Sequence, residues 1–132
     1  SIYDAMLLSV DVAHALHPNK KQKMDITNMP VMGKGFCIKQ ACSQSYATDA
    51  QAIAILCQLC DEKGIPYQRF VNRSDSRGGS TLGSIAGTLL PVKTVDIGIP
   101  ILAMHSACEL MGVRDMKALS DCVTAFFGYL GK

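Results

Sequence analysis

The stretch Met6-Leu7-Leu8-Ser9-Val10-Asp11-Val12 decides the fold, because it is apolar, has the length of a strand and breaks off before Pro18. Its aspartate is costly to bury unless a cation or hydrogen bonds compensate the negative charge. The stretch is therefore predicted to be a core strand, and its aspartate is predicted to have a cation or hydrogen-bond donors as partners.

Working outward, strand-like and helix-like segments alternate along the chain. Strands are predicted over residues 35–40, 67–71, 94–97 and 101–104, and residues 20–30 are predicted to be a loop. Helices are predicted from residue 48 to Gly64, from residue 80 to about Leu90, and over 113–130. This alternation predicts an α/β architecture.

Three local patterns sharpen these predictions. The Thr48-x-x-Gln51 pattern is typical of a capping box at the start of a helix. In the strand over residues 35–40, Phe36 and Ile38 lie on one face, whereas Cys37 and Lys39 lie on the other. The last helix is predicted to place its core-facing residues at helical spacing; these are Met116, Leu119, Val123, Phe126 and Phe127.

Composition narrows the class of protein. The 132 residues suit one domain or a piece of one, and 48% hydrophobic against 18% charged residues suits a globular core. A net charge of +2 does not favour nucleic acid or a membrane surface as partner. The lysines at 20, 21 and 23 are expected in a solvated loop. No apolar run approaches the roughly 20 residues of a membrane span. A cytoplasmic location is expected.

The six cysteines are predicted to be buried, reduced thiols. Cys57 and Cys60 form a single C-x-x-C pattern inside a predicted helix. A redox motif needs its first cysteine at a helix N-terminus, and a zinc site needs a second pair at suitable spacing. A cysteine-based metal or redox protein is therefore only a third, weaker hypothesis.

Polar residues at the ends of apolar strands are the candidate site. Asp11 lies in the first strand with His14 and His17 after it, and His105 follows residues 101–104. Sites in open α/β sheets gather where strands end. Aspartate and histidine suit zinc, manganese or cobalt. The alternatives are that Asp11 caps a turn and that each histidine only makes hydrogen bonds. Glu109 is interpreted as part of a Ser106-x-x-Glu109 capping box.

Five blocks of sequence, in one order and at compatible spacing, resemble the aspartyl aminopeptidase family over nearly the whole chain. They are SVDVAHALHPN (9–19), GKGFCIK (33–39), SYA (45–47), GSTLG (79–83) and VDIGIPILAMHS (95–106). Several blocks in one order are more specific than any single motif.

The resemblance implies roles for particular residues. Asp11 matches the aspartate of the family's S-x-D segment and His105 the histidine of its M-H-S segment, and both are zinc ligands there. His14, Lys39 and Tyr46 match residues that contact substrate. Lysine would present a compact positive charge to an acidic group, while His14 and Tyr46 would donate hydrogen bonds to a polarised carbonyl.

The resemblance also implies that residues 1–132 are the C-terminal part of a three-layer α/β/α zinc-peptidase domain. The implied activity is removal of N-terminal residues, with acidic ones as candidates, from peptides by a water that two zinc ions activate. The family's remaining ligands and its general-base glutamate lie upstream of the matching region. This segment alone is thus expected to be inactive, and the full-length protein is expected to be a homo-oligomer.

A hypothesis of a different class is a degenerate paralogue that acts as an interaction or assembly module without catalysis. The upstream reading frame distinguishes the two hypotheses, because a histidine, an aspartate and a Glu-Glu pair there favour the enzyme.

Overall fold

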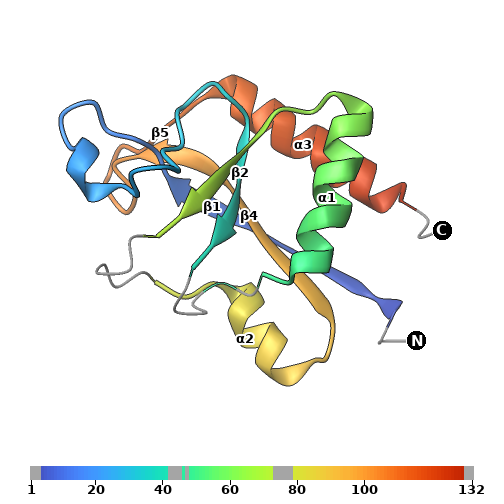
Figure 1. The fold of residues 1–132 in the computed structure, drawn as a ribbon. Coiled ribbons are helices and arrows are strands. Elements are labelled where there is room, and N and C mark those ends of the chain that lie inside the picture. Colours follow the sequence, from blue (N-terminus) through green and yellow to red (C-terminus); the bar gives the residue numbers. More distant parts are fainter. Residues whose placement is uncertain (1–3, 42–45, 47, 73–78, 130–132) are drawn as a thin grey trace.

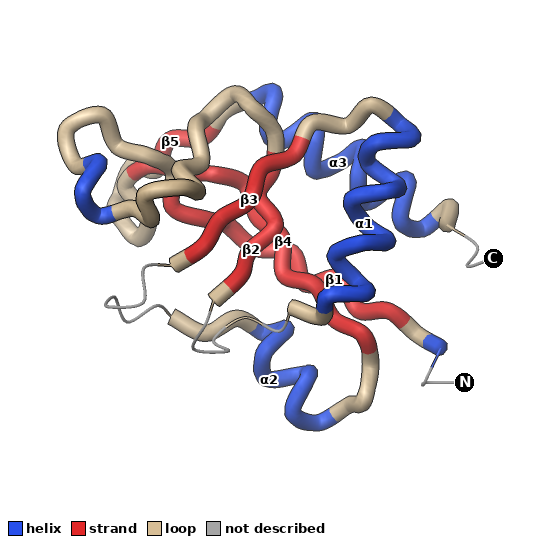
Figure 2. Tube along the Cα trace, in the orientation of Figure 1, coloured by secondary structure: helices blue, strands red, loops and turns tan. Residues whose placement is uncertain are grey.

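The computed structural model describes residues 4–41, 46, 48–72 and 79–129. They form one mixed sheet in the order β1-β4-β2-β3, and the short β5 pairs with the end of β4 (Figures 1 and 2). The strands are β1 (Met6–His14), β2 (Phe36–Gln40), β3 (Tyr67–Val71), β4 (Lys93–Leu102) and β5 (Leu110–Met111). β1 runs parallel to β4, β2 runs parallel to β3, and β2 is antiparallel to β4. A strand is present at each predicted place, and those predicted at 94–97 and 101–104 join into β4, which ends at Leu102. The short β5 was not predicted.

Helices cover both faces of the sheet. α1 (Ala50–Lys63) and α3 (Val113–Phe127) contact each other on one face, and α2 (Leu82–Leu89) lies apart from them (Figure 1). Gly83 of α2 lies so close to Ser9 and Asp96 that a Cβ atom there would fall 2.6 Å from the Asp96 carboxylate. Side chains alternate along a strand, so Asp96 faces away from the core residues Val95 and Ile97, and α2 covers the opposite face. The predicted α/β fold with flanking helices is confirmed.

A further helical segment is the 3-10 helix η2 (Lys21–Lys23), which lies within the predicted loop. Across the described ranges, none of the helices has the length and apolarity that a bilayer crossing requires.

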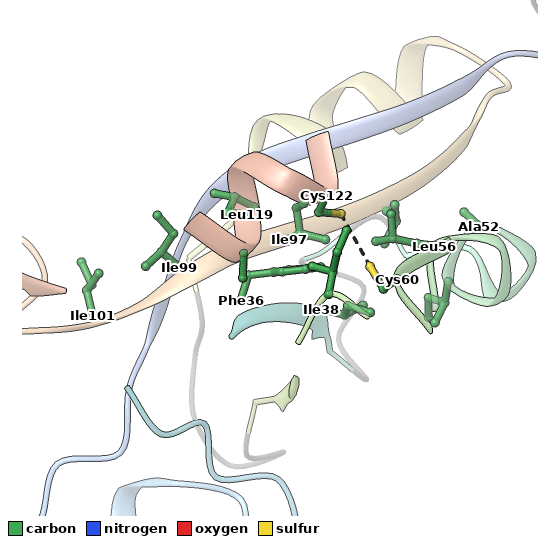
Figure 3. Packing of buried hydrophobic residues seen from close by; sticks show 14 residues of the cluster. Phe36, Ile38, Ala52, Leu56, Cys60, Ile97, Ile99, Ile101, Leu119 and Cys122 are labelled. Carbon is green, nitrogen blue, oxygen red and sulfur yellow. Dashed lines mark hydrogen bonds between the residues drawn. The ribbon is translucent and has the colours of Figure 1, made fainter. Parts of the chain in front are cut away.

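The main core lies between the sheet and the α1–α3 pair (Figure 3). Phe36 and Ile38 of β2 project into it, as their predicted shared face requires. Cys37 and Lys39 project from the other face, and both are buried as well. β2 is therefore covered on both sides, as suits a strand in the interior of a sheet.

The N-cap residue of α1 was predicted one position too early. Asp49 is the N-cap residue, and its carboxylate accepts hydrogen bonds from the backbone N–H groups of Gln51 and Ala52. The Thr48 hydroxyl instead donates to the carbonyl oxygen of Lys39, 2.7 Å away, so the predicted capping box is wrong. At the other end Gly64 adopts a φ of 64°, which confirms it as the helix stop.

The predicted core face of α3 is partly wrong. Leu119 is buried, but Met116 and Phe127 are 47% and 80% exposed. The buried positions beside Leu119 are held by small or polar residues, namely Asp115, Ala118 and Cys122. A prediction that follows only large apolar side chains misses such a face. α3 ends at Phe127, and Leu130 lies outside the described residues.

The cysteine prediction holds in part. The five described cysteines are free thiols, and Cys37, Cys60 and Cys122 are buried. Cys57 is half-buried and Cys108 is exposed, which contradicts burial for the latter. Cys42 lies outside the described residues.

Candidate metal and substrate site

The candidate site lies toward the end of the sheet where the parallel strands β1 and β4 finish. Asp11 pairs in register with Gly98, and His14 pairs with Ile101. His105 follows in the loop after β4. Parallel strands bring their carboxyl ends to one edge, and the register therefore places these three side chains in one region of the molecule.

Asp11 lies inside β1 and not at a turn, which contradicts the alternative that it caps one. β1 also continues through His14, so no turn separates the two residues. They are three positions apart on one strand, and their side chains project from opposite faces. Asp11 shares its face with Ala13, which packs against Cys37 and Phe70 on the α2 side of the sheet.

Lys39 is the cation that compensates the charge of Asp11. Its ammonium nitrogen lies 3.5 Å from Asp11 Oδ2 and donates a hydrogen bond of 2.9 Å to the Val12 carbonyl oxygen. It also lies 5.2 Å from the centre of the Tyr46 ring, within the range of a cation–π contact. The lysine side chain is 3% exposed and that of Asp11 is 52% exposed. Lys39 is thus anchored inside the protein, while Asp11 presents its carboxylate to solvent.

Gly98 permits the close approach of strands at this point. A Cβ atom at position 98 would lie 2.8 Å from the carbonyl carbon of Val12 and 2.9 Å from the backbone carbonyl oxygen of Asp11. Because only glycine lacks that atom, this residue sets how near Asp11 lies to β4.

The loop that carries His105 has a strained backbone. Ala103 and His105 adopt positive φ angles of 57° and 68°, which non-glycine residues seldom adopt. The backbone N–H of His105 donates to the Glu109 carboxylate at 2.6 Å, and Ser106 N–H donates to the Ala103 carbonyl oxygen. No helix begins at Ser106, so the predicted capping box is wrong. Such strain persists where the surroundings fix a functional geometry.

His14 is held toward its neutral form. Partial desolvation, together with the nearby His105 and Lys39, lowers the pKa of the His14 imidazole. A neutral imidazole carries one hydrogen-bond donor and one acceptor nitrogen. His14 also lines a cleft of about 450 Å³ with His17, Phe70, Asn72 and Met104.

Tyr46 connects Lys39 to this cleft. Asn72, which lines the cleft, donates a hydrogen bond of 3.2 Å from its side-chain amide to the Tyr46 hydroxyl. Burial raises the pKa of the Tyr46 hydroxyl, so the group keeps its proton at neutral pH. A protonated hydroxyl at the cleft can donate to a substrate oxygen.

The structure therefore joins Asp11, Lys39 and Tyr46 in one contact network and places His14 near His105. Within residues 4–41, 46, 48–72 and 79–129, no three His, Cys, Asp or Glu side chains gather closely enough to hold a metal ion. The donor types of Asp11 and His105 nevertheless fit zinc. Sequence reasoning missed Asn72, for which the sequence gives no signal, and it misread the role of Glu109.

Known proteins resemble this chain over most of its length. The family model described as aminopeptidase I zinc metalloprotease (M18) matches residues 1–127. A probable M18 family aminopeptidase 2 from Clostridium novyi (strain NT) is 52% identical over 111 residues, which are 84% of this chain and 26% of that protein.

Solved structures share the fold. The cryo-EM structure of the Ape4 and Nbr1 complex has a TM-score of 0.93 at 35% identity, covering 96% of this chain and 24% of the matched one. The S. cerevisiae mApe1 dodecamer has a TM-score of 0.82 at 26% identity, covering 94% of this chain and 27% of the matched one. The chain thus spans about a quarter of the length of these relatives.

Proposed function

Because the chain belongs to the aminopeptidase I zinc metalloprotease family (M18), we propose that residues 1–132 form the C-terminal part of a catalytic domain that removes N-terminal residues from peptides. The observation that carries the proposal is the half-exposed Asp11 carboxylate, held by a buried lysine at the edge where His105 is also presented. An exposed acceptor group with a fixed partner is suited to binding a metal ion.

In this proposal Asp11 and His105 each supply one ligand to a metal centre, and zinc agrees with the family description. Manganese and cobalt are alternatives for a mixed oxygen and nitrogen ligand set. When bound, zinc supplies Lewis acidity toward a carbonyl oxygen and lowers the pKa of a coordinated water. Two ions per complete site, the remaining ligands and the general-base glutamate are proposed to come from the part of the polypeptide that precedes this segment.

The chain's own residues would bind and orient the peptide. The His14 imidazole, held neutral, and the protonated Tyr46 hydroxyl would donate hydrogen bonds to the substrate near the scissile bond. Their place beside the cleft supports this role, because both groups lie within or next to its lining.

For Lys39 two roles are proposed. The family resemblance implies contact with an acidic substrate side chain. The distances support a second role, orientation of Asp11, because the ammonium already contacts that carboxylate and the Val12 carbonyl oxygen while almost wholly buried. The fixed ammonium would hold one carboxylate oxygen of Asp11 and leave the other free to bind the metal ion.

The same proposal extends to assembly. The matched S. cerevisiae protein is a dodecamer, and we propose a homo-oligomer for the full polypeptide. A cytoplasmic location stays a prediction from the sequence.

The test is hydrolysis of peptides that begin with Asp, Glu or Leu by the full polypeptide supplied with zinc. Asp11→Ala and His105→Ala are each expected to lower kcat/KM by more than about 100-fold, because loss of a ligand should exceed the 10–100-fold typical of its supporting residues. The matched control is Asp121→Ala, an exposed carboxylate on α3. Absence of turnover by the unmodified polypeptide with zinc, manganese or cobalt would favour the non-catalytic module.

A further inference from the structure

Two cysteines from different helices meet in the main core. The Cys60 thiol, in the last turns of α1, lies 3.8 Å from the Cys122 sulfur of α3, and neither residue is exposed to solvent. Figure 3 shows this contact as the dashed line between the two helices. Cys57 and Cys60 form the C-x-x-C pattern of the sequence, but the fold brings Cys60 into contact with Cys122.

We propose that Cys60 and Cys122 form a reversible disulfide bond that joins α1 to α3 when the protein meets a hydroperoxide. The two cysteines form a modification site separate from the proposed peptidase site, and this proposal does not depend on the peptidase function.

The geometry is close to that of a bond. A disulfide needs a sulfur–sulfur distance of about 2.05 Å. The observed 3.8 Å means that each sulfur must move by less than about 1 Å. The two helices already pack against each other and against the same sheet.

The hydrogen bond between the thiols makes them chemically unequal. Cys60 donates its proton toward Cys122, which raises the pKa of Cys60 and lowers that of Cys122. The thiolate is the reactive form of cysteine, and a hydrogen bond from Cys60 stabilises it at Cys122, so we assign Cys122 as the attacking sulfur and Cys60 as the resolving one.

The reaction balances with hydrogen peroxide as oxidant. The Cys122 thiolate attacks one peroxide oxygen, the O–O bond breaks, and the sulfur becomes a sulfenic acid while hydroxide takes up a proton to leave as water. Cys60 then attacks the Cys122 sulfur, the S–O bond breaks, and a second water leaves with the Cys60 proton. Two thiols lose two electrons and two protons, and one peroxide is reduced to two waters.

A groove brings solvent close to the pair. It has a volume of about 930 Å³ and lies between α1 and α3. Its lining includes the sequence neighbours of both cysteines, namely Leu59 and Asp121, together with Gln58, Glu62, Thr124 and Ala125. A small peroxide needs only a local separation of the two helices to reach the sulfurs.

Cys57 is a poorer partner for Cys60. It contacts Tyr67 of β3, and this hydrogen bond with Cys57 is the main reason that the pKa of Tyr67 rises to about 12. Its thiol is therefore engaged away from the α1–α3 contact. Cys57 and the exposed Cys108 serve as internal controls for oxidation of thiols other than the core pair.

The experiment treats the native full polypeptide with hydrogen peroxide, blocks free thiols, and maps peptides by mass spectrometry without a reductant. We expect a Cys60–Cys122 peptide pair that is two hydrogens lighter than its separate components and is lost on reduction. The pair should persist in Cys57→Ser and Cys108→Ser variants and be absent from Cys122→Ser.

Unmodified protein supplies the decisive result even if a variant misfolds. A Cys57–Cys60 link in place of the cross-helix pair, or recovery of both core thiols unoxidised after Cys108 has reacted fully, would overturn the proposal. The cross-link closes a loop between residues 62 positions apart, so the oxidised protein should also unfold several degrees higher. An unfolding midpoint unchanged by complete cross-linking would argue against a bond formed within the native fold.

Discussion

The two faces of the sheet are stabilised in different ways. On the α1–α3 face, branched and aromatic residues such as Phe36, Ile38 and Ile97 pack against the helices with little polar content. On the α2 face, Lys39 and Asp96 are buried, and specific partners compensate them, namely Asp11 for the lysine and the Thr81 hydroxyl for the aspartate. The α1–α3 face is therefore stabilised mainly by burial of apolar surface, and the α2 face by pairs of polar groups.

This difference between the two faces explains why metal and substrate ligands are expected on the α2 face. Apolar packing tolerates exchanges of similar volume, whereas a buried polar group needs one partner at one distance. The α2 face therefore orients side chains closely enough to serve as ligands, and the α1–α3 face supplies the rigid support behind it. The following changes test how far this division holds.

A large effect is expected from Asp115, a buried carboxylate of α3. Asp115 accepts hydrogen bonds of 2.7 Å from the backbone N–H groups of both Gly33 and Gly35. Asp115→Ala leaves two N–H groups without this acceptor, and a loss of about 3 kcal/mol in the free energy of unfolding is expected. Chemical denaturation of the full polypeptide measures the change.

The matched control for that change is Asp121→Ala on the same helix. Asp121 pairs with Lys117 at 2.7 Å but is exposed, so its loss should change stability by less than about 1 kcal/mol. Equal losses for the two variants would mean that the carboxylate of Asp115 does not hold the segment before β2.

The apolar face could be predicted from the sequence to a large extent, and the polar face could not. The alternation of Phe36 and Ile38 with Cys37 and Lys39 gives the orientation of β2, because period-two patterning reports burial directly. That pattern does not indicate that Lys39 lies beside Asp11. β4 lies between β1 and β2, so the contact between the two side chains depends on the order of strands in the sheet.

The helix termini and the His105 loop show the same limit. The Thr48 hydroxyl and the Glu109 carboxylate are both suited to helix capping, yet each has another partner. The hydroxyl donates to the Lys39 carbonyl oxygen, and the carboxylate accepts from the His105 N–H. A local motif lists what a side chain can bind, and tertiary contacts decide which partner it takes. The family resemblance supplied the candidate ligands, while their contacts came only with the fold.

A smaller effect is expected from Lys39→Met, which keeps the length of the side chain and removes its charge. If the lysine orients Asp11, zinc affinity should fall by about 10–100-fold, and turnover of peptides beginning with Asp and Leu should fall together. Competition with a chromophoric chelator measures the affinity, and kcat/KM for the two peptides measures the selectivity.

Lys34→Met is the matched control, because Lys34 is an exposed lysine in the same sequence block, residues 33–39. A loss confined to the Asp peptide, with zinc affinity intact, would assign Lys39 to the substrate side chain. No change in either quantity would remove Lys39 from the site altogether.

The smallest expected effect tests the corrected face of α3. Met116 is 47% exposed, whereas Leu119, three residues later, is 7% exposed within the main core. Met116→Ala should change the free energy of unfolding by less than about 0.5 kcal/mol, while Leu119→Ala should cost about 2–5 kcal/mol because it leaves a cavity. Parallel denaturation curves of the two variants compare them directly. A Met116→Ala loss as large as that of Leu119→Ala would mean that Met116 is covered in the full polypeptide, and the division between buried and open faces of α3 would then have to be redrawn.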